Sequence, residues 1–291
     1  MNAALFALVN GKQTSTISID DRGLTYGDGV FRTIAISDAK PKYLAQHLQK
    51  LGNDCERMAI PVPDRLLLNE EINLLCSRLI ADKAVLKIIV TRGVGERGYR
   101  INPYSNPSRI LALYAWPDYP VNYYLQGVRV GICNTRLSSN SQLAGIKHLN
   151  RLEQILARNE WQDNDIGEGL MLDGHNHVIS GTSSNLFMVK NNTLLTPKLK
   201  YAGVTGVMRE IILNKVSLIG INCEIKNISL ADLYEADELF LTNSLIGIWP
   251  VKQLGESYFT VGEITRRLQV DLNFINPLGP VPKVIAGLQN Q

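Results

Sequence analysis

A lysine follows a glycine by two positions in the stretch LAGIKHLNRLEQILAR, which runs from Leu143 to Arg158. The apolar residues after it recur at helical spacing, so we expect Lys147 to stand at the start of a helix. A lysine in this place is usually a surface charge. The positive end of the helix dipole disfavours a cation there, however, and this favours a lysine that must lose its proton. An amine with a lowered pKa can form a Schiff base with an aldehyde.

A second group of reactive side chains lies in RGVGERG, from Arg92 to Gly98. The glycines match a dinucleotide-binding fingerprint, but the following YRINPYSNP contains prolines and cannot form the helix that such a fingerprint requires. We therefore expect a flexible loop that presents Arg92 and Arg97. Two guanidinium groups suit a substrate with carboxylates, and the alternative is a solvated turn.

Two further motifs could bind a charged ligand. In AGVTGVMRE, from Ala202 to Glu210, two glycines and a threonine precede a predicted helix, whose first N–H groups can bind phosphate. Any helix start has such donors, so this stretch alone leaves phosphate binding open. DGHNH, from Asp173 to His177, has the look of a metal site, but it lies between two predicted strands, where Asp-Gly favours a hairpin turn. We expect no metal there, because no further cluster of cysteines or histidines accompanies it.

The elements that must position these motifs mix strands with helices, which predicts an α+β fold. In the first half we expect strands around 4–11, 30–37, 85–92 and 109–116, and helices around 44–58 and 66–82. In the second half we expect strands around 128–134, 168–174, 177–183, 185–190, 193–197, 222–229 and 236–244, and helices around 143–158, 205–220 and 260–275.

A proline- and tyrosine-rich connection, PDYPVNYYLQG, separates these two halves. We therefore predict a smaller N-terminal α/β domain over 1–117 and a larger C-terminal domain over 124–275, which would bind any cofactor. The tail 276–291 is rich in proline and glycine, and we expect it to be mobile.

Composition excludes several classes of protein. The chain of 291 residues is 45% hydrophobic and 20% charged, and its net charge of +3 comes from scattered basic residues, so we expect neither a nucleic-acid partner nor a membrane partner. It has no apolar run of about 18–20 residues and no basic segment at its start, which argues against a membrane span and a signal peptide. Its four distant cysteines favour reduced thiols in a cytoplasmic protein.

Several motifs occur together in one order, and in this the chain resembles the fold-type IV pyridoxal-phosphate enzymes, the family of branched-chain and D-amino-acid aminotransferases. The resemblance covers about residues 6–270. It is carried by DRGLTYGDGVFRTI, HLQKL, TRGVGERGY, LAGIKHLNRLEQ, SSNLF, AGVTGVMRE and ADELFLTNS. Within the family, GIKHLNRLEQ and RGVGERGY favour the members that eliminate pyruvate from 4-amino-4-deoxychorismate over the transaminases.

The resemblance implies pyridoxal 5'-phosphate as the cofactor, with Lys147 as the Schiff-base lysine and general base. The product would be 4-aminobenzoate for folate biosynthesis, and the enzyme would work as a homodimer on a small carboxylate-bearing amine. The other implied cofactor-binding residues are Lys50, Ser180, Thr205, Gly206, Val207, Met208 and Ser244. The implied substrate-binding residues are Arg32, Arg92, Arg97 and Tyr99.

Two positions depart from the family pattern. Family members carry an arginine that binds the cofactor phosphate where this chain has Lys50, and a lysine keeps the charge but loses the bidentate fork. In the family pattern V-x-E-G-x-x-x-N-x-F the Glu faces the pyridine nitrogen, whereas this chain reads VISGTSSNLF with Ser180 in that place. A hydroxyl donates a hydrogen bond but does not keep the ring protonated. This argues against transamination, whereas an elimination with an aromatic product tolerates it.

Three functions remain open at this point. The lyase is favoured, the first alternative is a pyridoxal-phosphate aminotransferase of branched-chain or D-amino acids or another lyase on amino acids, and the second is a family member with impaired catalysis that only binds the cofactor or a partner. Ser180 and Lys50 are the reasons for keeping the last.

Overall fold

The computed structural model describes residues 4–163 and 165–272, and the chain divides into two compact units. The first unit comprises Met1–Pro117 and the short segment Ile146–Arg151, and the second comprises Asp118–Gly145 and Leu152–Gln291. Helices and sheets occur in both, so the predicted α+β class is confirmed. The tail 276–291, predicted to be mobile, lies outside the described residues.

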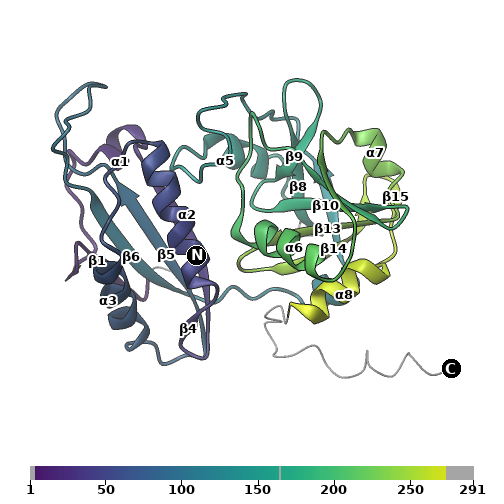
Figure 1. Ribbon diagram of the computed structural model, residues 1–291, viewed down its shortest axis with the longest axis horizontal. Helices are drawn as coiled ribbons and strands as arrows, with labels where there is room; N and C mark the ends of the chain where they lie inside the picture. The colour runs from purple at the N-terminus through teal and green to yellow at the C-terminus, as the bar shows by residue number, and fades with distance from the viewer. Residues whose placement is uncertain (1–3, 164, 273–291) are drawn as a thin grey trace. The chain divides into compact units, whose positions relative to one another are not determined.

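The first unit is built on a six-stranded antiparallel sheet with the order β2-β1-β6-β5-β3-β4. Helices α2 and α3 pack on one face of this sheet, as Figure 1 shows. The strands are β1 (Phe6–Val9), β2 (Lys12–Gln13), β3 (Gly29–Ser37), β4 (Lys40–Pro41), β5 (Lys83–Thr91) and β6 (Ser108–Ala115), and the helices are α1 (Arg22–Tyr26), α2 (Leu44–Arg57) and α3 (Arg65–Cys76).

Alternation along the strands explains which face the helices cover. Ile34 of β3 and Leu86 of β5 point into the helix-covered core together with Leu48 and Leu51 of α2, and all four are buried. Asp64 caps the start of α3 by accepting hydrogen bonds from two main-chain N–H groups. The helix ends at Cys76, which is earlier than the prediction to residue 82.

The segment around Lys147 forms no helix. It lies extended along the outer edge of β3, where the Phe31 N–H donates to the Lys147 carbonyl at 2.9 Å and the Leu149 N–H donates to the Gly29 carbonyl at 2.9 Å. The prediction of a helix from Leu143 was therefore wrong, because strand pairing satisfies the backbone groups that a helix would have used. Helix α5 (Leu152–Arg158) begins five residues after the lysine.

The second unit contains a nine-stranded mixed sheet, with the order β12-β11-β10-β13-β14-β7-β8-β9 and β15 paired to β14. The strands are β7 (Val128–Ile132), β8 (Ile166–Leu172), β9 (Val178–Gly181), β10 (Asn185–Lys190), β11 (Thr193–Pro197), β12 (Cys223–Lys226), β13 (Glu238–Asn243), β14 (Gly247–Leu254) and β15 (Ser257–Tyr258). The helices besides α5 are α4 (Asn122–Leu125), α6 (Val207–Leu218), α7 (Leu230–Tyr234) and α8 (Glu263–Asp271).

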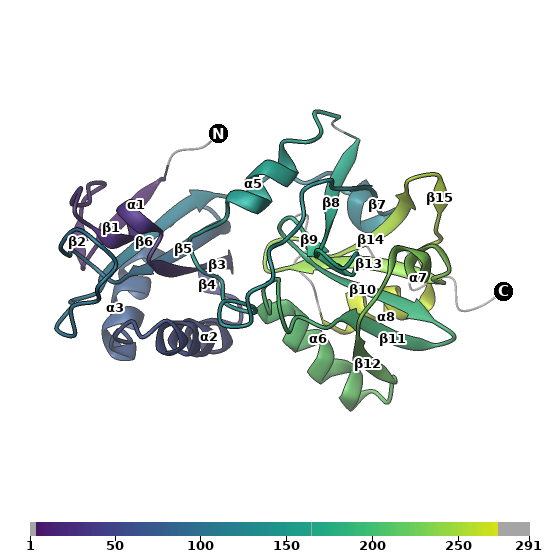
Figure 2. The same cartoon turned by 90° about the horizontal axis from the view of Figure 1, so that it is seen from above.

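Helices α6 and α8 lie on the same face of this sheet, as Figure 2 shows. Beneath them the rings of Phe187 and Phe240 stack with their centroids 5.0 Å apart. On the other face, Leu233 of α7 packs with a second buried apolar cluster. The two helices cover β10 and β13, and the residues of this unit that are predicted to bind the cofactor phosphate lie at the start of α6 and just after β13.

The four cysteines are free thiols, as predicted. Within the described part of the chain, no helix combines the length and the apolar character needed to cross a membrane. The DGHNH stretch is a hairpin turn between β8 and β9, in which Asp173 accepts hydrogen bonds from the N–H groups of His175 and His177.

Candidate active site

The main chain of Lys147 is held by a buried ion pair. Its N–H donates to Oδ2 of Asp54 on α2 at 2.9 Å. The guanidinium of Arg32 on β3 donates to the same oxygen at 2.5 Å and to the Lys50 carbonyl at 2.9 Å. The side chains of Arg32 and Asp54 are only 2% and 8% exposed. Each charge therefore needs the other to offset the free-energy cost of its burial.

The amine of Lys147 lies over the ring of Phe31, 4.5 Å from its centroid. Burial, together with the positive charges of Arg32, Arg151 and Lys87 and against the opposing effect of Asp54, lowers the pKa of this amine to about 7. The reason given from the sequence, a helix dipole, was wrong because the helix begins only at Leu152. A large fraction of the amine is therefore neutral and nucleophilic near pH 7.

Two buried residues of α2 belong to this cluster but were missed in the sequence. Asp54 anchors Lys147, and His47 has a pKa lowered to about 3 by burial and by the charges of Arg32 and Lys147, which keeps its ring neutral. Both lie on the buried face of an amphipathic helix. A carboxylate in such an apolar stripe needs a partner, and that is the signal that could have identified Asp54.

Arg92 does not line a flexible loop as predicted. Its guanidinium donates to Asp28 at 2.7 and 3.0 Å, and to the carbonyls of Met58 and Ala59 at 2.8 and 2.6 Å. The side chain is 3% exposed. Arg92 therefore ties the end of β5 to the end of α2, and Arg32 is likewise committed to Asp54, so neither guanidinium is available to a substrate without breaking a buried ion pair.

The glycine loop that follows is also anchored. Arg22 donates to the Gly98 carbonyl at 2.8 Å, and the hydroxyl of Tyr26 accepts a hydrogen bond from the Gly98 N–H at 2.8 Å. The ring of Tyr99 packs edge-on against Tyr26, with 5.6 Å between centroids. The side chain of Arg97 is exposed, and among the described residues it has no hydrogen bond or ion pair. Of the two loop arginines, only Arg97 is thus free to bind an anion.

In the second unit, the start of α6 presents main-chain N–H groups. The cap residue is Gly206, which has no side chain that could accept a hydrogen bond from these N–H groups. Asn185 holds this turn in place, since its side chain accepts from the Gly206 N–H at 3.1 Å and donates to the Val204 carbonyl at 2.9 Å. The N–H groups of Val207 and Met208 at this helix start suit a phosphate. The Thr205 hydroxyl donates to the Gly145 carbonyl at 3.0 Å.

Ser180 and Ser244 lie near a hydrogen-bonded turn of the same unit. Ser180 on β9 is buried, and its hydroxyl donates to the Gly181 carbonyl at 2.8 Å. In the turn that follows, the buried carboxylate of Glu168 accepts hydrogen bonds from the hydroxyls of Thr182, Ser183 and Ser184. Asn243 donates to the Ser183 carbonyl at 3.2 Å, which joins this turn to the residue preceding Ser244.

The predicted residues are divided between the two units. The first contains Lys147, Arg32 and Lys50, with Arg97 and Tyr99 on a loop of the same unit. The second contains Ser180, Ser244 and the helix start from Thr205 to Met208.

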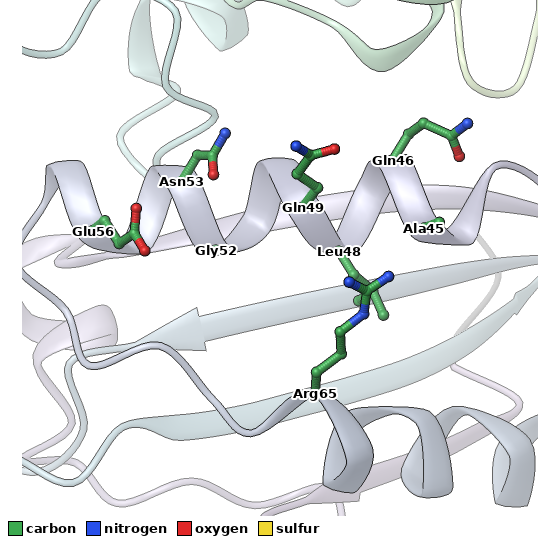
Figure 3. Close-up of a pocket in the computed structure, with 8 residues that line it drawn as sticks. All are labelled: Ala45, Gln46, Leu48, Gln49, Gly52, Asn53, Glu56 and Arg65. Atoms are coloured by element: carbon green, nitrogen blue, oxygen red, sulfur yellow. The ribbon is translucent and has the colours of Figure 1, made fainter.

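A pocket of about 460 Å³ lies on α2, and none of the predicted residues lines it. Figure 3 shows that Gln46, Gln49 and Asn53 project from one side of α2, while Arg65 reaches toward this helix from the start of α3. The remaining lining residues are Ala45, Leu48, Gly52 and Glu56. We therefore do not assign the active site to this pocket.

The fold and these motifs define an enzyme class. The chain matches the amino-transferase class IV family over residues 29–254 and belongs to that family. The predicted fold-type IV pyridoxal-phosphate enzyme is thereby confirmed as a family assignment, and pyridoxal phosphate is the cofactor of that family.

Within the family, the relatives include lyases and aminotransferases. The chain is 34% identical to an aminodeoxychorismate lyase of Vibrio harveyi over 91% of this chain and 98% of the relative. A similar solved structure is the crystal structure of 4-amino-4-deoxychorismate lyase from Pseudomonas aeruginosa, with a TM-score of 0.88 and 46% sequence identity. The match covers 92% of this chain and 98% of that chain. A D-alanine aminotransferase of Listeria monocytogenes is 26% identical over 84% of each chain. The resemblance to the lyase branch is therefore confirmed.

Proposed function

We propose that the protein is a pyridoxal-phosphate-dependent lyase that converts 4-amino-4-deoxychorismate to 4-aminobenzoate and pyruvate. The observation that carries the proposal is the environment of Lys147, a rigidly held lysine whose pKa is lowered to about 7. The similarity to two lyases over almost the whole chain supports the choice of reaction.

The residues present fit the cofactor. Excess positive charge around Lys147, from Arg32, Lys87 and Arg151, favours an anionic aldehyde. In our proposal Lys147 holds the cofactor covalently, Lys50 and the N–H groups of α6 bind its phosphate with Thr205, Gly206, Val207, Met208 and Ser244, and Ser180 faces the ring nitrogen. When bound, pyridoxal phosphate supplies an electron sink that stabilises negative charge developing on the substrate.

The main chemical role of the chain itself is to transfer a proton through Lys147. Lys147, when not bound to the cofactor, has an amine of which about half is neutral near pH 7, so it can accept the proton from the ring C–H of the substrate. Its backbone is fixed by Asp54 and by Phe31, so the amine returns to one position in each turnover. Loss of the enolpyruvyl group makes the ring aromatic, which drives the reaction forward. Arg97 and Tyr99 lie on the substrate side in this proposal.

Ser180 supports a lyase over an aminotransferase. Its side chain is a hydroxyl, which donates to the Gly181 carbonyl. It therefore has no carboxylate that could hold a proton on a ring nitrogen. A weaker electron sink penalises transamination most, because that reaction has no aromatic product to drive it. The same substitution is the reason for keeping a catalytically impaired cofactor-binding protein as the second candidate.

We also propose that the enzyme is a cytoplasmic homodimer. The apolar residues of α5 support this, since Leu152, Ile155 and Leu156 are 71%, 62% and 60% exposed. Exposed apolar side chains at helical spacing are typical of a surface that another protein copy covers. Reduced cysteines fit the cytoplasm.

Two assays on the cofactor-loaded protein test the proposed reaction. Pyruvate release from 4-amino-4-deoxychorismate is measured beside keto-acid formation from branched-chain and D-amino acids. We expect pyruvate release to be the faster reaction by orders of magnitude and to disappear in Lys147→Ala. Faster keto-acid formation would identify an aminotransferase, and neither activity in a protein that retains the cofactor would identify the impaired form.

A further inference from the structure

Glu168 on β8 is a buried carboxylate to which the proposed function gives no role. The residue is 4% exposed, and within residues 4–163 and 165–272 it forms no ion pair. Its two oxygens instead accept six hydrogen bonds, three on each oxygen, at distances from 2.5 to 3.1 Å. These donors offset the free-energy cost of burying the charge.

Five of the six hydrogen bonds come from the turn 182–184. The N–H groups and hydroxyls of Thr182 and Ser183 donate to the carboxylate, and so does the Ser184 hydroxyl. This turn connects β9 to β10, which are not paired with each other in the described part of the sheet. Because no strand ladder joins the two strands, the turn depends on the carboxylate for most of its hydrogen bonds.

The turn leads directly into a side chain that supports the start of α6. Asn185 is the next residue, and its amide accepts from the Gly206 N–H at 3.1 Å and donates to the Val204 carbonyl at 2.9 Å. A Cβ atom on Gly206 would lie only 2.4 Å from the Asn185 oxygen, so the two residues are in close contact. A displacement of Asn185 would therefore move the N–H groups at the start of α6, which are proposed to bind the phosphate.

A second amide connects the turn 182–184 to the segment that contains Ser244. Asn243, the last residue of β13, donates to the Ser183 carbonyl at 3.2 Å. Its own oxygen accepts from the N–H groups of Leu245 and Ile246 at 2.8 and 3.0 Å. These bonds fix the main chain on both sides of Ser244. The turn held by the carboxylate thus meets the supports of both segments of this unit that are proposed to bind the phosphate.

We infer that Glu168 is a positioning residue for the cofactor phosphate. It fixes the turn 182–184, and through Asn185 and Asn243 this turn fixes the donors that bind the phosphate. The inference rests on the proposed function, in which the phosphate lies at the start of α6 and at Ser244. Glu168 acts through these donors, so its replacement should weaken the grip on the phosphate and leave the rest of the cofactor site intact.

Glu168→Gln is the most informative substitution. Each oxygen of Glu168 accepts from a main-chain N–H, that of Thr182 or that of Ser183, and such a group cannot act as an acceptor. The amide of a glutamine would therefore place N–H against N–H in either orientation.

Glu238 provides a matched control from the same unit. It is a buried carboxylate whose two oxygens accept from the N–H groups of Ile264 and Thr265 at the start of α8. Glu238→Gln creates the same mismatch at a helix start to which no cofactor contact is assigned.

The first test compares two ligands, pyridoxal 5'-phosphate and pyridoxal, which lacks the phosphate. Equilibrium dialysis of the cofactor-free full-length protein measures Kd for each. In Glu168→Gln we expect Kd for pyridoxal 5'-phosphate to rise at least about 10-fold and Kd for pyridoxal to rise less than about 3-fold. Glu238→Gln should change neither by more than about 3-fold. A general defect of the fold weakens both ligands alike, so equal weakening in Glu168→Gln overturns the inference, as does unchanged binding of both.

The second test observes the phosphate itself in the loaded protein. Phosphorus NMR at saturating pyridoxal 5'-phosphate should show a shifted signal in Glu168→Gln and the parent signal in Glu238→Gln. A parent signal in Glu168→Gln overturns the inference. If Glu168→Gln does not fold, Ser184→Ala replaces it, because this change removes one of the six donors and keeps the carboxylate. It should weaken pyridoxal 5'-phosphate by about 3-fold and pyridoxal not at all, and an unchanged preference between the ligands overturns the inference.

The parent protein separates this inference from the proposed function. A parent that binds pyridoxal 5'-phosphate no more tightly than pyridoxal has no phosphate site, and both the proposed site and the inference then fail. A parent that prefers the phosphate but releases no pyruvate contradicts the proposed reaction alone, and the two glutamine variants still decide the role of Glu168.

Discussion

The main-chain N–H of Lys147 donates a hydrogen bond to Oδ2 of Asp54 at 2.9 Å, across 93 positions of sequence. The same carboxylate neutralises the buried guanidinium of Arg32. The carbonyl of Lys147 accepts a hydrogen bond from Phe31, so both polar groups of its main chain are fixed. The reactive lysine is thus positioned by its backbone, and its side chain remains free for chemistry.

Replacing Asp54 should show what this carboxylate contributes. Asp54→Leu leaves Arg32 buried without a counter-ion and removes the acceptor for Lys147, so we expect a loss of about 3–5 kcal/mol in the free energy of unfolding. Asp54→Asn keeps an acceptor of the same shape and should lose less. Urea unfolding of both variants measures the difference, and equal losses would show that the hydrogen bond to Lys147 contributes nothing.

The uptake of pyridoxal phosphate by the cofactor-free protein should depend on pH through Lys147. Its pKa is lowered from 10.5 to about 7, so the amine is protonated and unreactive below pH 7 and neutral above it. The uptake rate should therefore rise with pH, reach half its maximum near pH 7 and level off by about pH 9. Stopped-flow absorbance measures the rate, with Lys147→Ala as a blank. A rate still rising at pH 10 would mean that Lys147 has the pKa of a surface lysine.

The two loop arginines should respond differently to replacement by alanine. Arg97→Ala should lower kcat/KM by the equivalent of about 1.5–3 kcal/mol without changing the melting temperature, because Arg97 is exposed and has no protein partner among the described residues. Arg92→Ala should instead destabilise the fold by about 3–5 kcal/mol, because Arg92 is buried against Asp28. Calorimetry and kinetics on both variants separate the roles. Normal kinetics in Arg97→Ala would make the loop a simple solvated turn.

Lys50 should set how firmly the cofactor is retained. Lys50→Arg gains a bidentate donor and should slow the loss of pyridoxal phosphate during dialysis, provided that the phosphate lies within reach. Lys50→Ala should speed this loss, and the absorption band of the bound cofactor reports both changes. If Lys50→Ala retains the cofactor as well as the parent does, Lys50 does not bind the phosphate.

Ser180→Glu should change the two reactions unequally. A carboxylate facing the ring nitrogen keeps it protonated, so half-transamination with D- or L-amino acids should rise, while pyruvate release should change less because aromatisation already lowers its barrier. Ser180 is buried, so a carboxylate in its place destabilises the protein when no pyridinium is present to pair with it. The variant and the parent are therefore compared with the cofactor bound and with the fold verified. Equal gains in both reactions would remove Ser180 as a reason for preferring the lyase. No gain in transamination would mean that Ser180 does not face the nitrogen.

Local patterns predicted most elements but not the contacts between distant ones. The amphipathic spacing of α2 and the alternation along β3 and β5 were visible in sequence, because each depends on neighbours a few positions apart. The segment at Lys147 was mistaken for helix, because its pairing partner Gly29–Phe31 lies more than a hundred positions away. Arg92 was misassigned for the same reason. The sequence does not show whether an arginine binds a ligand or forms a buried ion pair, as Arg92 does with Asp28. Only the three-dimensional structure distinguishes the two cases.

The pairing of the Lys147 segment with β3 also orders events during synthesis of the chain. The ribosome releases residues 1–117 well before residues 146–151, yet the first unit includes both. Until the later segment arrives, the edge of β3 around Val30 is an open strand, of the kind that pairs with other chains. The residues that close this edge are those that carry the reactive amine. A nascent chain therefore completes its first unit and positions its lysine in a single step.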